Sequence, residues 1–214
     1  MEAVGIVGNS MRKKVIFTQR VEIIETYNER RDCADQRIAL FIEKCGYCPV
    51  PVPNNAEIAL LLLEELKPQG IILTGGNSLV KYGGNAPERD ETDRMLISEA
   101  VKRRLPLYGF CRGMQSILDY FGNDLENVTG HVAVKHIIQG CEETRTVNSY
   151  HNQGCLELKS TELECCMRSD DGVIEKVKHN NLPIIGTMWH PEREEYYSRY
   201  DTDQVKKLIE GVKH

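Results

Sequence analysis

A cysteine between two glycines, at the junction of an apolar run and a helical pattern, is the feature that most constrains how this chain folds. The apolar run 105–110 predicts a buried strand, and the pattern from Arg112 onward predicts a helix that begins directly after Cys111. A turn this sharp needs residues without side-chain bulk, which Gly109 and Gly113 supply. Strand, sharp turn and helix together are typical of a nucleophile elbow, in which the helix N-terminus favours negative charge on the sulfur.

A histidine and a carboxylate further along the chain supply the partners that a cysteine nucleophile needs. The apolar segment 182–189 predicts a buried strand that leads to His190, and Glu192 follows two residues later. A carboxylate at that spacing can orient the imidazole through one ring nitrogen. A lone cysteine is usually a small core residue, and a lone histidine is usually structural. Because both motifs occur in one chain, we interpret Cys111 as nucleophile, His190 as base and acid, and Glu192 as the orienting group.

Short apolar runs alternate with amphipathic patterns, which predicts an α/β fold with a mostly parallel central sheet and helices on both faces. The predicted strands are 15–19, 50–52 (an edge strand), 70–74 and 105–110, and the predicted helices are 32–45, 55–66, 91–103, 112–122 and 202–212. The pieces 132–136, 144–149, 156–158 and 172–177 predict a more antiparallel C-terminal half. The inward residues of helix 55–66 are expected to be Ile58, Leu61, Leu62 and Leu66. The expected helix N-caps are Asp90 and Asp201.

Length and composition favour a single domain and exclude several functions. A chain of 214 residues with 41% hydrophobic residues buries a sizeable core. A net charge of −5 with scattered basic residues argues against a nucleic-acid surface, and no apolar run reaches the length of a membrane span. Residues 1–10 are open to two interpretations, a strand or a leader outside the domain, so the domain is assigned to 11–214.

The eight cysteines are expected to be reduced, mostly buried thiols of a cytoplasmic protein, because no secretory leader is present. Cys45 and Cys48 have the C-x-x-C spacing, but no second such pair follows, so no metal site is expected. Cys45 is expected to face the core at a helix end. His131 and His136 are expected to be structural, hydrogen-bonded residues.

The chain resembles the class I glutamine amidotransferase family, and more closely its γ-glutamyl hydrolase branch. The resemblance runs from about residue 15 to 192, and rests on Gly-Gly at 75–76, Gly-Phe-Cys-Arg-Gly-Met-Gln at 109–115, Val-Asn-Ser-Tyr-His-Asn-Gln at 147–153 and Trp-His-Pro-Glu at 189–192. It implies hydrolysis of a small γ-glutamyl amide through a γ-glutamyl thioester on Cys111, with no metal or organic cofactor.

The resemblance also implies roles for further residues. Gly76 and Arg112 would donate backbone N–H groups to an oxyanion hole. The residues that would hold the glutamyl group are Gly75, Gln115, Asn148, Ser149, Tyr150 and His151.

Two adjacent arginines are candidates for binding the leaving group. Arg30 and Arg31 lie in the segment 27–37, which we expect to be a loop and helix start at the edge of the sheet where α/β folds place their sites. Guanidinium groups match phosphate geometry, and the alternative is a solvated charged loop. The resemblance implies a nucleotide-linked phosphoramidate as the leaving group. The glycine-rich loop 77–87 is long enough to act as a lid.

Three other functions stay open. The chain could hydrolyse a γ-glutamyl amine such as γ-glutamyl-aminobutyrate, or act as a glutaminase subunit that supplies ammonia to a partner synthetase. The sequence shows no synthetase domain, which favours a free-standing hydrolase. A binding or regulatory domain without turnover is the third alternative, and the intact Cys111, His190 and Glu192 argue against it.

Overall fold

The fold is built on one nine-stranded sheet. The structure is a computed structural model, which describes residues 12–141 and 143–211. In their order across the sheet, the strands are β4 (Cys48–Pro51), β1 (Lys14–Phe17), β5 (Gly70–Leu73), β6 (Leu107–Phe110), β13 (Ile184–Thr187), β12 (Ile174–His179), β11 (Leu163–Ser169), β8 (Val132–Gly140) and β9 (Thr144–Tyr150). Neighbours pair in parallel from β4 to β13 and antiparallel from β13 to β9. The prediction of a mostly parallel sheet with a more antiparallel C-terminal half is confirmed.

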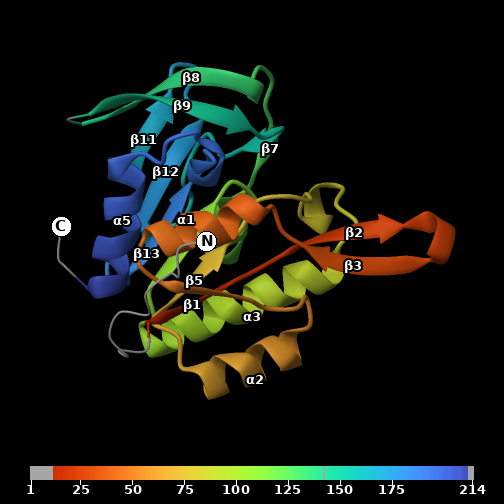
Figure 1. The fold of residues 1–214 in the computed structure, drawn as a ribbon. Helices are drawn as coiled ribbons and strands as arrows, with labels where there is room; N and C mark the ends of the chain where they lie inside the picture. Colours follow the sequence, from red (N-terminus) through yellow and green to blue (C-terminus); the bar gives the residue numbers. More distant parts are fainter. Residues whose placement is uncertain (1–11, 142, 212–214) are drawn as a thin grey trace, which may run out of the picture.

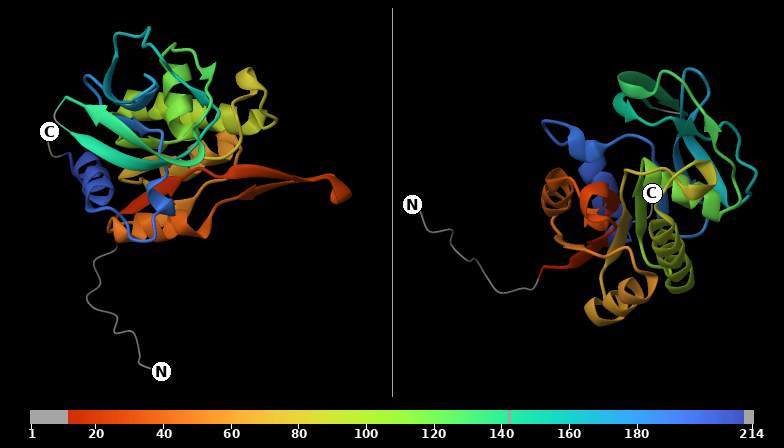
Figure 2. Two further views of the ribbon diagram at one scale, coloured as in Figure 1. Left: turned by 90° about the horizontal axis from the view of Figure 1, so that it is seen from above. Right: turned by 90° about the vertical axis from the view of Figure 1, so that its right-hand side faces the viewer.

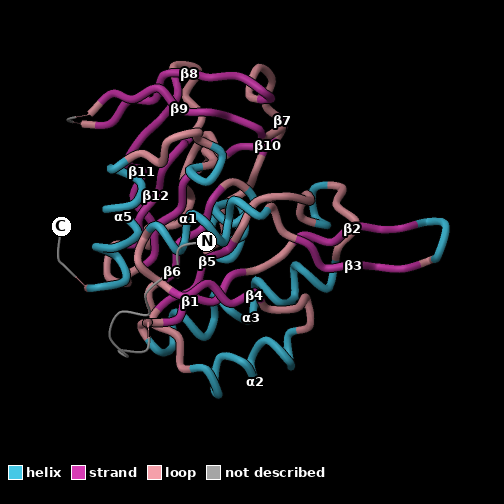
Figure 3. Tube along the Cα trace, in the orientation of Figure 1, coloured by secondary structure: helices cyan, strands magenta, loops and turns pink. Residues whose placement is uncertain are grey.

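Helices cover both faces of the sheet, as predicted (Figure 1). They are α1 (Gln36–Lys44), α2 (Ala56–Leu66), α3 (Pro87–Arg103), α4 (Arg112–Tyr120) and α5 (Arg199–Glu210). In the right-hand view of Figure 2, α1 and α5 lie on one side of the parallel strands and α3 lies on the other. The antiparallel strands β8, β9, β11 and β12 gather at one end of the molecule (Figure 3).

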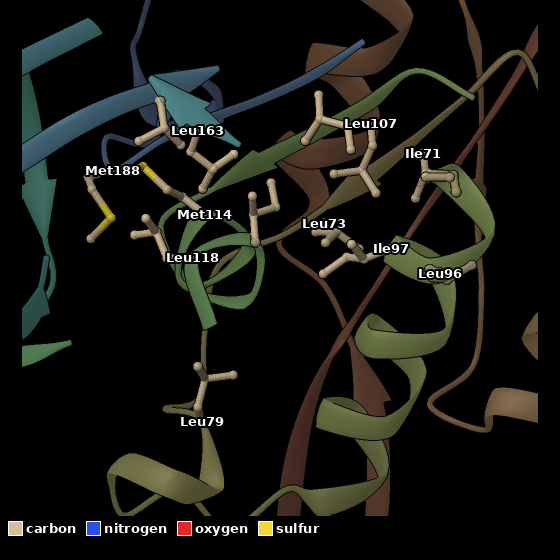
Figure 4. Close-up of a cluster of buried hydrophobic side chains, with 14 of the residues drawn as sticks. Ile71, Leu73, Leu79, Leu96, Ile97, Leu107, Met114, Leu118, Leu163 and Met188 are labelled. Carbon is tan, nitrogen blue, oxygen red and sulfur yellow. The ribbon is translucent and has the colours of Figure 1, made fainter. Parts of the chain in front are cut away.

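Alternation along the parallel strands divides the core into two halves. Val15, Phe17 and Ile72 pack with the apolar side chains of α1 and α5. Ile71 and Leu73, which point to the opposite face, pack with α3 and α4, and Figure 4 shows this second cluster. Because successive strand residues point to opposite faces, an apolar run of four residues serves both halves.

Two segments have a secondary structure that differs from the predicted one. Residues 20–33 form a hairpin of β2 (Arg20–Ile24) and β3 (Glu29–Cys33), which extends away from the sheet (Figure 1), whereas a loop and helix start were predicted from residue 27. The sequence of β3 is Glu-Arg-Arg-Asp-Cys, which lacks the apolar alternation that marks a strand. Residues 156–158 are not a strand, and β11 lies instead at Leu163–Ser169.

Helix α2 buries a different face from the one predicted. Ala59 and Leu63 are buried, whereas Ile58 and Leu61 are 47% and 57% exposed. The predicted Leu62 and Leu66 are half-buried against the core. Leucines occupy consecutive positions 60–63 and so point to every side of the helix, which leaves the choice of face to packing against α3 and the sheet.

Asp90 and Asp201, the two predicted helix N-caps, do not cap their helices. Helix α3 begins at Pro87 with Ala86 as N-cap, so Asp90 lies in the first turn. Helix α5 begins at Arg199 with Ser198 as N-cap, and the buried Asp201 accepts a hydrogen bond from Trp189 Nε1 at 3.0 Å. Both aspartates are used in tertiary contacts because the helices start one turn earlier than the apolar pattern indicates.

The cysteines form no disulfide within the ranges described, and Cys45 is buried at the end of α1, as predicted. Cys141 is exposed and four others are half-buried, so fewer thiols are buried than expected. Among the described residues, no helix combines the length and apolarity that crossing a membrane requires. The prediction for residues 1–10 falls outside the described residues, as does residue 212 of the predicted helix 202–212, which ends at Glu210 in the structure.

Candidate functional site

The turn at Cys111 has the predicted geometry of a nucleophile elbow. Strand β6 ends at Phe110, α4 begins at Arg112, and Cys111 between them has φ 51° and ψ −112°. A residue with a side chain pays about 1–3 kcal/mol for such a conformation, so surrounding contacts must hold it. The Cys111 N–H donates to the Thr187 carbonyl of β13 at 2.8 Å, and a Cβ at Gly113 would overlap the backbone of Leu73. Contacts with β13 and β5 therefore hold the elbow in this conformation.

His190 and Glu192 lie together after β13, in the arrangement that their spacing predicts. His190 Nδ1 and Glu192 Oε1 are 2.7 Å apart, and both side chains are buried. The imidazole is held edge-on between the rings of Phe110 and Tyr150, with centroids 5.7 and 5.5 Å away. Its tautomer and orientation are thus set on the Nδ1 side, which leaves Nε2 for chemistry.

The Nε2 side of His190 faces the elbow. In the part of the chain that the structure describes, Nε2 has no hydrogen-bond partner that meets normal geometry. A Cβ at Gly75 would lie 3.4 Å from this nitrogen and 3.5 Å from Cys111 Cβ, so the two side chains border the same space. Burial lowers the pKa of His190, but the Cys111 sulfur and Glu192 outweigh it and raise the pKa to about 9. The imidazole is therefore protonated at neutral pH.

Asn148 positions His190 through its backbone. Its Oδ1 accepts from the His190 N–H at 2.9 Å, and its Nδ2 donates to the His190 carbonyl at 2.9 Å and to Glu194 at 2.6 Å. The side-chain amide is therefore engaged within the protein. Ser149 is fully buried and donates to the His131 carbonyl at 2.7 Å.

A buried arginine that sequence reasoning missed organises the Gly-Gly turn. Arg89, in the first turn of α3, is fully buried and donates to three successive carbonyls, those of Thr74, Gly75 and Gly76, at 2.8, 2.9 and 2.5 Å. In a trans peptide, C=O and N–H point in opposite directions, so holding the Gly75 carbonyl directs the Gly76 N–H to the other side. Burial lowers the pKa of Arg89 to about 9. The only signal in the sequence is a charged run that reads as a solvated helix start.

Arg112 begins the elbow helix with its side chain turned away from the cysteine. The guanidinium is buried and pairs with Asp93 and with Asp90, the latter at 2.5 Å. Asp90 also accepts from the Val80 N–H at 2.8 Å, which fixes the loop 77–87 to α3. The Arg112 side chain is therefore engaged with α3 rather than with Cys111.

Two clefts meet beside Cys111 and His190. The elbow cleft has a volume of about 260 Å³ and is lined by Gly76, Asn77, Ser78, Cys111, Arg112, Gln115, Tyr150, His151, Asn152 and Gln153. The hairpin cleft is narrow, with a volume of about 30 Å³, and is lined by Arg20, Cys33, Ala34, Asp35, Ile38, Thr74, Gly75, Gly76, Phe110, His190, Glu192 and Arg193. Gly76 lines both.

Of the six residues predicted to hold the glutamyl group, four line one of the two clefts. Gln115, Tyr150 and His151 line the elbow cleft, and Gly75 lines the hairpin cleft. Asn148 and Ser149 belong to neither lining, because their polar groups bond within the protein.

Arg30 and Arg31 lie in β3 rather than in a loop, and neither lines a cleft. Arg30 donates to Glu88 at 2.6 Å and to the Asn85 carbonyl at 2.9 Å, which ties the hairpin to the loop 77–87. Arg31 pairs with Glu29 on the surface at 2.8 Å. The arginines that the fold does bring to the hairpin cleft are Arg20 and Arg193.

Comparisons with known proteins find chains that are similar in sequence and in fold. The family model "Glutamine amidotransferase class-I" matches residues 32–202. A γ-glutamyl-CDP-amidate hydrolase of Campylobacter jejuni is 33% identical over 83% of this chain and 89% of its own length. A γ-glutamyl-γ-aminobutyrate hydrolase of Escherichia coli O157:H7 is 32% identical over 69% of this chain and 73% of its own length. Among solved structures, a putative GMP synthase subunit from Thermoplasma acidophilum has a TM-score of 0.69 at 20% identity, covering 92% of this chain and 93% of that one, which shows the shared fold.

Proposed function

Because this chain belongs to the class I glutamine amidotransferase family and is a γ-glutamyl amide hydrolase, we propose that its substrate is γ-glutamyl-CDP-amidate. The products are glutamate and cytidine diphosphoramidate, and the reaction serves the modification of capsular polysaccharide in the cytoplasm. The observation that carries the proposal is that Cys111 and His190 lie where two clefts meet, one for each half of such a substrate.

In the first half of the reaction, the Cys111 sulfur attacks the γ-carbonyl carbon and forms a tetrahedral intermediate. Its oxyanion accepts hydrogen bonds from the backbone N–H groups of Gly76 and Arg112, which are fixed before substrate arrives. When the C–N bond breaks, protonated His190 donates its Nε2 proton to the leaving nitrogen. The glutamyl group is then held as a thioester on Cys111.

In the second half, neutral His190 takes a proton from water as the water oxygen attacks the thioester carbonyl. The C–S bond breaks, glutamate leaves, and the thiolate–imidazolium pair is restored. Glu192 keeps the imidazole in one orientation and stabilises its charge in both halves. Thiol and imidazole together supply the nucleophile and both proton transfers.

The two halves of the substrate lie at the two clefts in this scheme. The glutamyl group occupies the elbow cleft, beside Gln115, Tyr150 and His151. The leaving group extends outward on the His190 side, where Arg20 and Arg193, which line the narrow hairpin cleft, are available to a phosphate-bearing group. The similarity to the Campylobacter jejuni γ-glutamyl-CDP-amidate hydrolase supports this assignment.

The experiment that tests the proposal compares kcat/KM for glutamate release from γ-glutamyl-CDP-amidate, γ-glutamyl-aminobutyrate and glutamine. A preference of several orders of magnitude for the nucleotide compound is expected. A preference for γ-glutamyl-aminobutyrate would reassign the enzyme to γ-glutamyl amines. Turnover of glutamine that requires an added synthetase would make it a glutaminase subunit, and binding without any turnover would make it a non-catalytic domain.

A further inference from the structure

A buried cluster of three histidines and one glutamate, which the reaction does not use, lies behind the wall of the elbow cleft. Glu175 of β12 is fully buried, and His131, His136 and His151 direct one ring nitrogen each toward its carboxylate. His151 also lines the elbow cleft, so the cluster adjoins the catalytic site. His131 and His136 are five residues apart in the sequence, whereas His151 and Glu175 lie further along it, and this spacing resembles no familiar metal motif.

The distances in the cluster are too long for hydrogen bonds and suit a shared ion. Glu175 Oε1 lies 3.5 Å from His131 Nδ1, 3.6 Å from His136 Nε2 and 3.4 Å from His151 Nε2. Ordinary N–H···O distances are about 2.7–3.2 Å. Ligand atoms around a tetrahedral ion with bonds of about 2.0–2.1 Å lie roughly 3.3–3.4 Å apart. The ligand atoms of His131, His151 and Glu175 all lie within 4.8 Å of one another.

The facing atoms also lack partners. Within the described residues, none of the three ring nitrogens and neither Glu175 oxygen has a hydrogen-bond partner that meets normal geometry. Leaving so many buried polar groups unpaired destabilises the folded state, because each has lost its hydrogen bonds to water without gaining others. One cation between His131, His151 and Glu175 would satisfy these groups, and His136 Nε2, 3.6 Å from Glu175 Oε1, would complete its ligand set.

In His131 and His151, the ring nitrogen opposite to the one that faces Glu175 is held as in metal-bound histidines. His131 Nε2 lies 2.8 Å from Asp171 Oδ2, and His151 Nδ1 lies 3.1 Å from the Gln153 carbonyl. A carboxylate or carbonyl behind the imidazole fixes its tautomer and aims the other nitrogen at the ion.

A bulge in β8 brings two of the histidines to one side. His131 and His136 are five residues apart, which in a regular strand would place them on opposite faces. The pairing of β8 with β9 shifts register between Val132 and Val134, and Ala133 between them has φ 56°. The extra residue reverses the alternation, so the two imidazole centroids lie 4.8 Å apart.

We propose that His131, His136, His151 and Glu175 form a binding site for one divalent first-row transition metal ion, with Zn²⁺ as the ion that best suits three imidazoles and a carboxylate. With four protein ligands the site is closed and structural. The ion joins β8, the end of β9 and β12, and so holds the segment 147–153 against the elbow cleft. The backbone of Glu175 also accepts from the Met188 N–H at 2.8 Å, next to the strand that leads to His190.

The test is metal binding by the full chain after removal of metal with a chelator. We expect titration with Zn²⁺ alone to reach one ion per chain and to raise Tm, and Co²⁺ to give the visible absorption of a tetrahedral site. Glu175→Gln and the more accessible His136→Gln should each weaken Zn²⁺ binding at least about tenfold. Asp171→Asn should weaken it about 10–100-fold, because that carboxylate supports a ligand rather than binding the ion.

Matched controls separate this site from the thiols. A Cys45→Ser, Cys48→Ser double variant and Cys111→Ala should bind Zn²⁺ as the wild-type protein does. Loss of the ion from the cysteine variants alone would overturn the proposal. So would failure of the folded wild-type chain to bind Zn²⁺ in stoichiometric amount, or unchanged affinity in folded Glu175→Gln and His136→Gln.

Discussion

At the scale of single residues, the site works because buried groups fix the atoms around the cysteine from several directions. Glu192 orients the His190 ring and Asn148 anchors its backbone. Arg89 holds the carbonyls of the Gly-Gly turn, and Thr187 accepts the Cys111 N–H. Catalysis in this picture depends on preorganisation rather than on substrate-induced assembly.

Replacing Cys111, the proposed nucleophile, gives the first prediction. Cys111→Ala should abolish glutamate release, because no other described thiol lines the elbow cleft. The variant keeps a Cβ at the same backbone conformation, so its circular dichroism and Tm should stay close to those of the wild type. Comparable turnover in the variant would remove Cys111 from the role of nucleophile.

Arg89 gives the second prediction. Arg89→Lys keeps the positive charge but loses the guanidinium group that donates to three carbonyls. The orientation of the Gly76 N–H is then less well fixed. We expect kcat to fall by about 10²–10³-fold with KM little changed, which is the scale of losing one oxyanion donor. Arg94→Lys, an exposed arginine on the same helix, is the matched control and should leave kcat unchanged. A rise in KM alone would point instead to a role in binding the ground state.

At the scale of elements, the hairpin of β2 and β3 connects the leaving-group side of the site to the loop 77–87. Arg20 at its base lines the hairpin cleft, whereas Arg30, further along, bonds to Asn85 and Glu88 of the loop and α3. The hairpin is therefore positioned to contact a leaving group and to hold the loop beside it.

The hairpin arginines give the third prediction. Arg20→Ala should lower kcat/KM for the phosphate-bearing substrate far more than for γ-glutamyl-aminobutyrate, because only the former presents an anionic group to the hairpin cleft. The Arg30→Ala, Arg31→Ala double variant is expected to show a selective loss of the same kind. Equal losses on both substrates would remove the altered residues from leaving-group recognition.

At the scale of the whole molecule, the Cys111–His190 pair links folding stability to pH. The folded-state pKa of His190, about 9, lies above its ordinary value of about 6.5. A raised pKa contributes stability that is fully present below the ordinary value and is lost as pH rises through the folded value. The window for this loss is therefore pH 6.5 to about 9.

The fourth prediction follows from that window. The unfolding free energy of the wild type, measured with denaturant, should decline from about pH 6.5 to 9 by more than that of Cys111→Ala, which lacks the sulfur that raises the His190 pKa. An NMR titration should place the His190 pKa lower in the variant. Identical pH profiles would show that the sulfur carries no charge opposite the imidazole.

Features whose cause is local were predictable from the sequence. The elbow follows from glycines on either side of Cys111, and the His190–Glu192 pair follows from a spacing of two residues after a buried strand. The alternation of apolar runs was enough to predict the fold class, because it reports which faces are buried. Consecutive leucines in α2 carried no such information, and the predicted face was wrong.

The sequence by itself therefore determined the nucleophile turn, the imidazole–carboxylate pair and the layered α/β plan, since each depends on neighbours within one element. Only the tertiary structure decided that Arg89 reaches the Gly-Gly turn, that Asn148 anchors a histidine 42 residues away, and that three distant histidines surround Glu175. Those contacts join side chains from different elements. Burial excludes water, so each polar group must find its partner across the fold, and sequence spacing does not encode that choice.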